Sequence, residues 1–207
     1  MKKKVYLNTI ISSVGQIILL ALGIIVPRIM IGNYGSDVNG LISTITQIFT
    51  YMALLEAGIG QAARNALYKP LANHDDDGVS YIVSLAQRYY RKITTVYFAG
   101  VILLSIILPF IIKTQIDKRI VFVAVLFEGL SGVITFFFIQ TPSNLLTVDG
   151  KGYINNIVTV VNKTISYIVK IVMAMMGINI VVLQISYFVI TVCKVFYYEY
   201  YFKKNYS

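Results

Sequence analysis

A row of polar side chains between positions 156 and 170 is the feature of this sequence with the clearest chemical potential. The row consists of Asn156, Thr159, Lys163, Ser166 and Lys170. Because a helix turns by about 100° per residue, these five side chains fall within an arc of roughly 80° on one face. A lysine at membrane depth costs at least about 2.5 kcal/mol on insertion scales, so two in register normally face a bundle interior or a wet cavity. The row therefore predicts a cavity that could hold an anionic substrate.

Two further residues could take part in the same cavity. Arg28 follows Pro27 near the end of the first apolar stretch. Its guanidinium could anchor that stretch at the membrane interface, or it could face the cavity and bind a phosphate through two hydrogen bonds. Gln47 shares a helix face with Thr44 and Tyr51, which supply amide and hydroxyl groups that suit sugars. The candidate substrate-binding residues are thus Arg28, Gln47, Asn156, Lys163, Ser166 and Lys170.

Two carboxylates lie within apolar stretches, at Glu56 and Glu128. Each could bind a coupling proton or a sodium ion, or it could form an ion pair with Arg64, Lys163 or Lys170. Ion coupling and ion pairing both remain open from the sequence.

The elements that must position these residues are membrane-spanning helices. Of the 207 residues, 57% are hydrophobic and only 13% are charged, and the mean hydropathy is +0.73. Soluble domains carry about 25% charged residues, and a helix needs about 20 residues to cross the hydrocarbon core. The sequence therefore predicts an all-α, polytopic membrane protein with six transmembrane helices in one bundle. The expected spans are 8–31, 41–66, 94–112, 120–147, 154–176 and 179–202.

The net charge of +9 is distributed as in a membrane protein, so it does not indicate a nucleic-acid partner. Eleven of the eighteen cations lie at or beyond the span ends on one side, four lie at or beyond the span ends on the other, and Lys163, Lys170 and Lys194 lie deeper within spans. The positive-inside rule then places both termini and the loop 67–93 in the cytoplasm. We expect Lys194, near the inner end of the last span, to extend to the cytoplasmic interface.

Three local patterns predict how the spans are connected. Residues 32–40 read as a tight polar turn, because they are rich in glycine, asparagine and aspartate. Residues 77–92 read as an amphipathic cytoplasmic helix that runs into the third span, after helix-starting aspartates at 75–77. Pro142, near the end of the fourth span, indicates a bend.

Enzymatic chemistry has little support in the sequence. The single histidine, His74, stands beside three aspartates in a loop, and no histidine and cysteine cluster has metal-ligand spacing. There is no glycine-rich phosphate loop and no nucleophile with an evident base. We therefore expect no enzyme activity, no cofactor and no metal.

Several short motifs resemble those of bacterial polysaccharide-biosynthesis flippases. They are the stretches Asn33-Tyr-Gly-Ser-Asp-Val-Asn-Gly-Leu41, Leu55-Glu-Ala-Gly-Ile-Gly60, Leu67-Tyr-Lys-Pro-Leu-Ala72 and Tyr89-Tyr-Arg91. Their order and spacing carry the resemblance over residues 20–112, and the rest of the chain is similar in topology alone. These flippases belong to the multidrug/oligosaccharidyl-lipid/polysaccharide exporter superfamily.

The resemblance implies a transporter in the bacterial cytoplasmic membrane. Its substrate would be a sugar repeat unit on an undecaprenyl pyrophosphate carrier, moved from the inner to the outer leaflet by alternating access around a cationic cavity. The family fold has two helical bundles. By helix-face reasoning, Arg28, Lys163 and Lys170 would hold the anionic head, and Gln47, Asn156 and Ser166 would meet sugars; the family pattern does not supply these roles.

This chain departs from the family in length, because members usually have about twice as many spans. It resembles one amino-terminal bundle, which implies a second bundle as partner besides membrane lipids and the lipid-linked oligosaccharide. Alternative interpretations are a multidrug exporter half of the same superfamily, a non-transporting membrane scaffold, and a truncated inactive fragment. A membrane half of an ABC exporter fits less well, because the long cytoplasmic helices of that class are missing.

Overall fold

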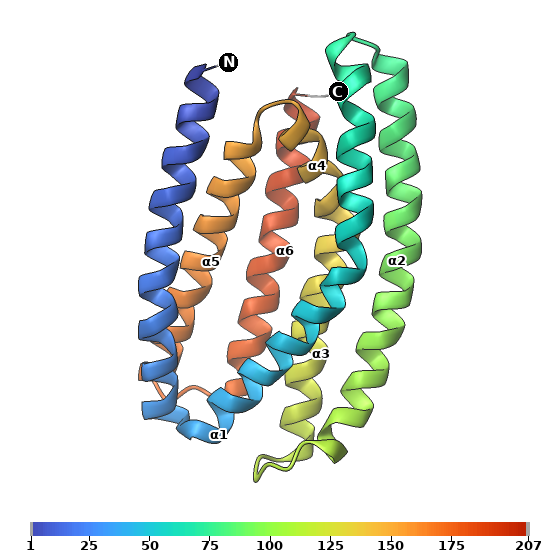
Figure 1. Cartoon of the computed structure of the whole chain (residues 1–207). Coiled ribbons are helices and arrows are strands. Elements are labelled where there is room, and N and C mark those ends of the chain that lie inside the picture. The colour runs from blue at the N-terminus through green and yellow to red at the C-terminus, as the bar shows by residue number, and fades with distance from the viewer. Residues whose placement is uncertain (1, 206–207) are drawn as a thin grey trace.

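The computed structural model describes the backbone of residues 2–205, and the side chains of residues 9–205 except positions 11 and 55. Over this part of the chain the structure is all-helical, with no strand. Its elements are α1 (Lys2–Ala72), α2 (Asp76–Ile111), α3 (Lys118–Ile134), the π-helix η1 (Thr135–Ile139), α4 (Gln140–Val148), α5 (Gly152–Met175) and α6 (Ile180–Asn205). Figure 1 shows them as one bundle of roughly parallel rods.

Helix α1 reverses its direction at Gly35. The backbone there has φ 87° and ψ 166°, a conformation that favours glycine because it has no Cβ. Figure 1 shows the first limb (residues 2–34) and the second limb (residues 36–72) running in opposite directions. The turn predicted at 32–40 is therefore much shorter than expected, because only Gly35 leaves the helical conformation while the other residues continue the helix. Polar side chains that are common in turns can form hydrogen bonds with the backbone of their own helix. Asn33 Nδ2, for example, donates to the Ile29 carbonyl at 2.9 Å.

Five helical segments are long and apolar enough to cross a membrane, which makes this a multi-pass membrane protein. They are Ser12–Leu54, Asp76–Ile111, Lys118–Val148, Gly152–Met175 and Ile180–Asn205. The first of these includes parts of both limbs of α1, so the predicted number of six crossings is not confirmed by this count. The two ends of the described chain lie at the same end of the bundle (Figure 1).

Helix α2 combines two predicted elements. It runs without interruption from Asp76 to Ile111, so the expected amphipathic segment 77–92 and the expected span 94–112 form one helix. Its N-cap is Asp75, whose carboxylate accepts a hydrogen bond from the Gly78 N–H at 2.9 Å. At 1.5 Å per residue this helix is about 54 Å long, which exceeds a hydrocarbon core of about 30 Å. Its first turns therefore extend beyond the core.

Where the sequence predicts a bend near Pro142, the structure has the π-helix η1. Proline lacks an N–H and its ring conflicts with the carbonyl four residues earlier, and the five-residue π segment directly precedes α4, which contains that proline. The Gln140 N–H accordingly donates to the carbonyl of Thr135, five residues back. Such π segments occur frequently at functional sites.

The apolar core is divided between two groups of helices. The second limb of α1 packs with α2 and α3 through Ile45, Val101 and Val125, none of which is exposed. The first limb packs instead with α5 and α6, where Ala174 and Leu183 are buried. The candidate site lies where these two groups meet.

Candidate functional site

A polar cavity of about 470 Å³ lies inside the bundle. Its walls come from the second limb of α1, from α2, from α3 with η1, and from α5 and α6. Its charged side chains are Glu128, Lys163, Lys170 and Lys194. Hydroxyl groups of threonine, serine and tyrosine supply most of the remaining polar surface. The structure thus assembles a charged pocket from five parts of the chain that are far apart in sequence.

Three ammonium groups enter this cavity from two helices. Lys163 and Lys170 come from α5, and Lys194 comes from α6. Lys194 is within electrostatic reach of Lys163, whereas Glu128 interacts with Lys170. None of the three forms a direct ion pair with a described residue. This part of the cavity carries uncompensated positive charge, which favours an anionic ligand.

Glu128 and Lys170 form a second, balanced part of the cavity. The Oε1 atom of Glu128 accepts a hydrogen bond from Thr46 Oγ1 at 3.3 Å, and Lys170 lies within electrostatic reach without a direct ion pair. The Lys170 ammonium is instead 5.0 Å from the centre of the Tyr187 ring, a cation–π distance. The buried Oε2 atom of Glu128 has no hydrogen-bond partner among the described residues. Because buried polar groups are normally paired, that atom is a candidate acceptor for a proton, a cation or a ligand.

Ser166 lines the cavity between the two lysines of α5 and is only 3% exposed. Its hydroxyl donates to the Asn162 carbonyl at 2.9 Å, one turn earlier in the same helix. The serine oxygen can therefore accept a hydrogen bond from a ligand, while its proton is already donated to the backbone carbonyl.

Three of the predicted substrate residues are not part of the cavity. Arg28 is exposed on the first limb of α1, and Gln47 is exposed beside Thr46 on a different face of the second limb. Asn156 donates to Ser12 Oγ at 2.6 Å and so joins α5 to the first limb of α1. Asn156 shares a helix face with Lys170, but 14 residues separate them, or about 21 Å along the axis. A shared face therefore did not mean a shared pocket.

Glu56 lies outside the cavity and belongs to a different polar network. It accepts a hydrogen bond from the Tyr90 hydroxyl at 2.7 Å, and Asn144 Nδ2 donates to the same hydroxyl at 2.9 Å. The Arg64 guanidinium donates to Asn144 Oδ1 at 2.7 Å. Arg64, one of the ion-pair partners considered for Glu56, is instead connected to it by a chain of hydrogen bonds through two neutral side chains, which joins α1, α2 and α4.

Sequence reasoning missed the contribution of α6. Lys194 was expected to extend to the cytoplasmic interface, but it lines the cavity together with Tyr187 and Thr191. These three residues are spaced i, i+4 and i+7, which places them on one helix face. This spacing could have indicated from the sequence that α6 lines the cavity, but most residues around these three are apolar.

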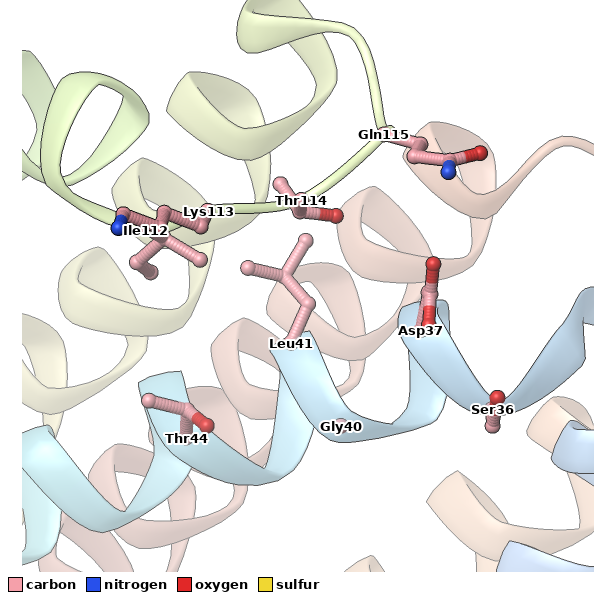
Figure 2. Close-up of a pocket in the computed structure, with 9 residues that line it drawn as sticks. All are labelled: Ser36, Asp37, Gly40, Leu41, Thr44, Ile112, Lys113, Thr114 and Gln115. Atoms are coloured by element: carbon pink, nitrogen blue, oxygen red, sulfur yellow. The ribbon is translucent and has the colours of Figure 1, made fainter.

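A second pocket, of about 660 Å³, lies at the end of the bundle opposite the chain ends. Figure 2 shows it between the start of the second limb of α1 and the loop after α2, with Asp37 and Leu41 pointing toward residues 112–115. Its charged residues are Asp37 and Lys113, both exposed. It has no cluster of like charges, so the central cavity is the stronger candidate.

Metal-binding chemistry is not indicated by the described residues, among which no group of three or more histidine, cysteine, aspartate or glutamate side chains comes together. Comparison of the chain with protein-family models, with curated proteins and with solved structures finds no match. The case for a function therefore rests on the central cavity and on the motif resemblance.

Proposed function

We propose that the chain is a transport bundle that moves lipid-linked oligosaccharides across the bacterial cytoplasmic membrane. In this proposal the pyrophosphate of the carrier lipid binds near Lys163 and Lys194. The observation that carries the proposal is the convergence of three lysines and one glutamate on a single cavity, for a net charge of +2.

The charge and size of the cavity support this class of substrate. Attraction between a pyrophosphate and two ammonium groups is stronger at membrane depth than in water, because the effective dielectric constant is lower. The cavity volume of about 470 Å³ falls within the usual range of ligand sites, about 300–1,000 Å³. It is large enough for a pyrophosphate and the first sugar, and the hydroxyl-rich wall suits the sugar.

The proposal includes six crossings and a second bundle. Six crossings require the two limbs of α1 to traverse the membrane separately, and the reversal at Gly35 supports this. Alternating access needs two halves that move against each other, so a second bundle, from the same polypeptide or another chain, completes the transporter. The excess of cations at the end of the bundle that carries both chain ends supports a cytoplasmic position for that end.

A binding measurement tests the proposal before any partner bundle is known. The protein would be placed in nanodiscs and titrated with a radiolabelled short-chain polyprenyl pyrophosphate. We expect Lys163→Gln combined with Lys194→Gln to weaken binding by about tenfold or more, because each charge-assisted hydrogen bond is lost. Lys170→Gln should weaken it less, since Glu128 already offsets that charge.

The matched control is Arg28→Gln, which removes a cation outside the cavity and should leave binding unchanged. The proposal fails if the double variant binds the probe as well as the wild type does, or if Arg28→Gln has the same effect as the double variant.

A multidrug exporter half is the second candidate, and Glu128 with the Tyr97 and Tyr187 rings at the cavity favours it. A hydrophobic cation would bind against these groups, and the lysine substitutions would not weaken its binding. A non-transporting scaffold would retain wild-type polysaccharide export in cells after Lys163→Leu and Lys170→Leu.

A further inference from the structure

A separate groove of about 820 Å³ lies between the first half of α2 and the segment formed by η1, α4 and the end of α6. Figure 1 shows the start of α2 and the end of α6 at the same end of the bundle, where both ends of the described chain lie. The groove shares no lining residue with the central cavity, although η1 contributes residues to both.

The two walls of the groove differ in polarity. The α2 wall carries Asp76, Ser80, Gln87 and Arg91, which fall within an arc of about 60° on one helix face. The opposite wall is mainly apolar and includes the aromatic side chains Phe137, Phe138 and Phe202. A ligand that is polar along one side and apolar along the other would match this groove.

The charged groups of the groove do not neutralise one another. The Arg91 guanidinium lies 5.9 Å from the centre of the Phe137 ring and forms no ion pair with a described residue. The carboxylates of Asp76 and Glu199 line the same groove, and they also form no ion pair with a described residue. The cation and the two anions are therefore available to ligands in the groove.

These charges are ordered along the membrane normal. Arg91 follows Asp76 by 15 residues, or about 22 Å along α2. About 20 residues of α2 remain after Arg91, which is the length that crosses a hydrocarbon core. Arg91 is thus at interface depth, whereas Asp76 begins α2 outside the core and Glu199 lies in the last two turns of α6.

We propose that this groove binds a phospholipid whose headgroup bears a primary ammonium, as in phosphatidylethanolamine. The lipid phosphate binds Arg91, because a guanidinium matches phosphate oxygens with two parallel hydrogen bonds. The ammonium, with three N–H donors, reaches the carboxylate of Glu199. Asp76 lies about 22 Å from Arg91 along α2, too far for the same headgroup to contact. The acyl chains lie against the aromatic wall. A purely anionic headgroup would meet the Glu199 carboxylate, and a trimethylated one has no N–H to donate.

Competition between lipids tests this inference. The purified protein would be placed in nanodiscs containing equimolar phosphatidylethanolamine, phosphatidylcholine and phosphatidylglycerol, and the lipids it retains would be measured by native mass spectrometry. We expect the wild type to retain phosphatidylethanolamine about tenfold over each of the other two. Arg91→Gln should abolish retention of all three, whereas Glu199→Gln should remove the preference over phosphatidylglycerol.

Two matched controls keep the outcome interpretable. Arg88→Gln removes an exposed cation of α2 that does not line the groove, and it should leave retention unchanged. Ser80→Trp fills the groove without changing any charge and should abolish retention, whereas Leu85→Trp, on the opposite side of α2 and outside the groove, should not. Equal loss in Arg88→Gln and Arg91→Gln, unchanged retention in Ser80→Trp, or equal retention of all three lipids by the wild type would overturn the inference. None of these measurements depends on transport, so the inference can fail while the proposed function stands.

Discussion

At the scale of single residues, Tyr90 illustrates how this bundle is held together at its polar end. Its side chain is only 1% exposed, and its hydroxyl donates to Glu56 while accepting from Asn144. Arg64 extends the same network through Asn144. A single hydroxyl thus forms hydrogen bonds with groups from α1 and α4. Removing it should lower the free energy of unfolding more than an average surface substitution does.

We expect Tyr90→Phe to destabilise the protein by about 1–3 kcal/mol, because a buried donor and acceptor lose their partner. Thermal unfolding in detergent micelles would measure the effect. Tyr89→Phe is the control, since that side chain is 50% exposed, and its unfolding temperature should match that of the wild type. A similar decrease in both variants would argue against the network.

The cavity residues carry the function argument at the same scale. Lys163 and Lys194 interact electrostatically with each other, whereas Lys170 interacts with Glu128. This difference is the reason for expecting unequal effects of the lysine substitutions on pyrophosphate binding. An equal loss of pyrophosphate binding on substitution of each of the three lysines would contradict this assignment, even if the wild type binds the probe.

At the scale of elements, the close approach of α2 and α3 depends on Gly129. A Cβ at this position would come within 2.7 Å of a Val101 methyl group and within 2.8 Å of the Phe49 ring. Both neighbours are buried core residues, so neither can move away freely. The second limb of α1, α2 and α3 therefore meet at a site that tolerates only a hydrogen atom.

We expect Gly129→Ala to destabilise the bundle by about 1–3 kcal/mol, the usual effect of overpacking a core. Gly58→Ala is the matched control, because this helical glycine has no neighbour within 4 Å, and alanine there should stabilise by about 0.5–1 kcal/mol. Chemical unfolding of the two variants in mixed micelles would compare them directly. Opposite signs are the expected result, and equal effects would show that the contact is unimportant.

At the scale of the whole molecule, the number of crossings depends on the two limbs of α1. If each limb crosses separately, residues near the reversal at Gly35 lie on the opposite side of the membrane from His74, which begins the connection to α2. If the second limb does not cross, this separation disappears. The arrangement of the limbs in Figure 1 favours the first case.

Site-directed labelling would test whether the second limb of α1 crosses the membrane, which six crossings require. In a Cys193→Ser background, Asp37→Cys should react with a membrane-impermeant maleimide in intact cells, whereas His74→Cys should react only after permeabilisation. Both positions are exposed in the structure, so lack of reaction would report on the membrane and not on burial. Labelling of both from the same side would exclude six crossings and, with them, the proposed bundle topology.

The sequence by itself determined the class of the protein and part of its site. Long apolar runs require helices in a membrane, because no other structure satisfies the backbone there. The periodicity of α5 placed Lys163, Ser166 and Lys170 on one face, and all three line the cavity. Periodicity is a local property, so it survives in the folded chain.

Only the tertiary structure decided which faces meet. Packing of the first limb of α1 against α5 removed Asn156 from the cavity, and the position of α6 brought Lys194 into it. Arg28 and Gln47 were left on other surfaces, and Glu56 found Tyr90 from a different helix. These outcomes depend on distances between helices that are far apart in sequence, and helix periodicity contains no information about such distances.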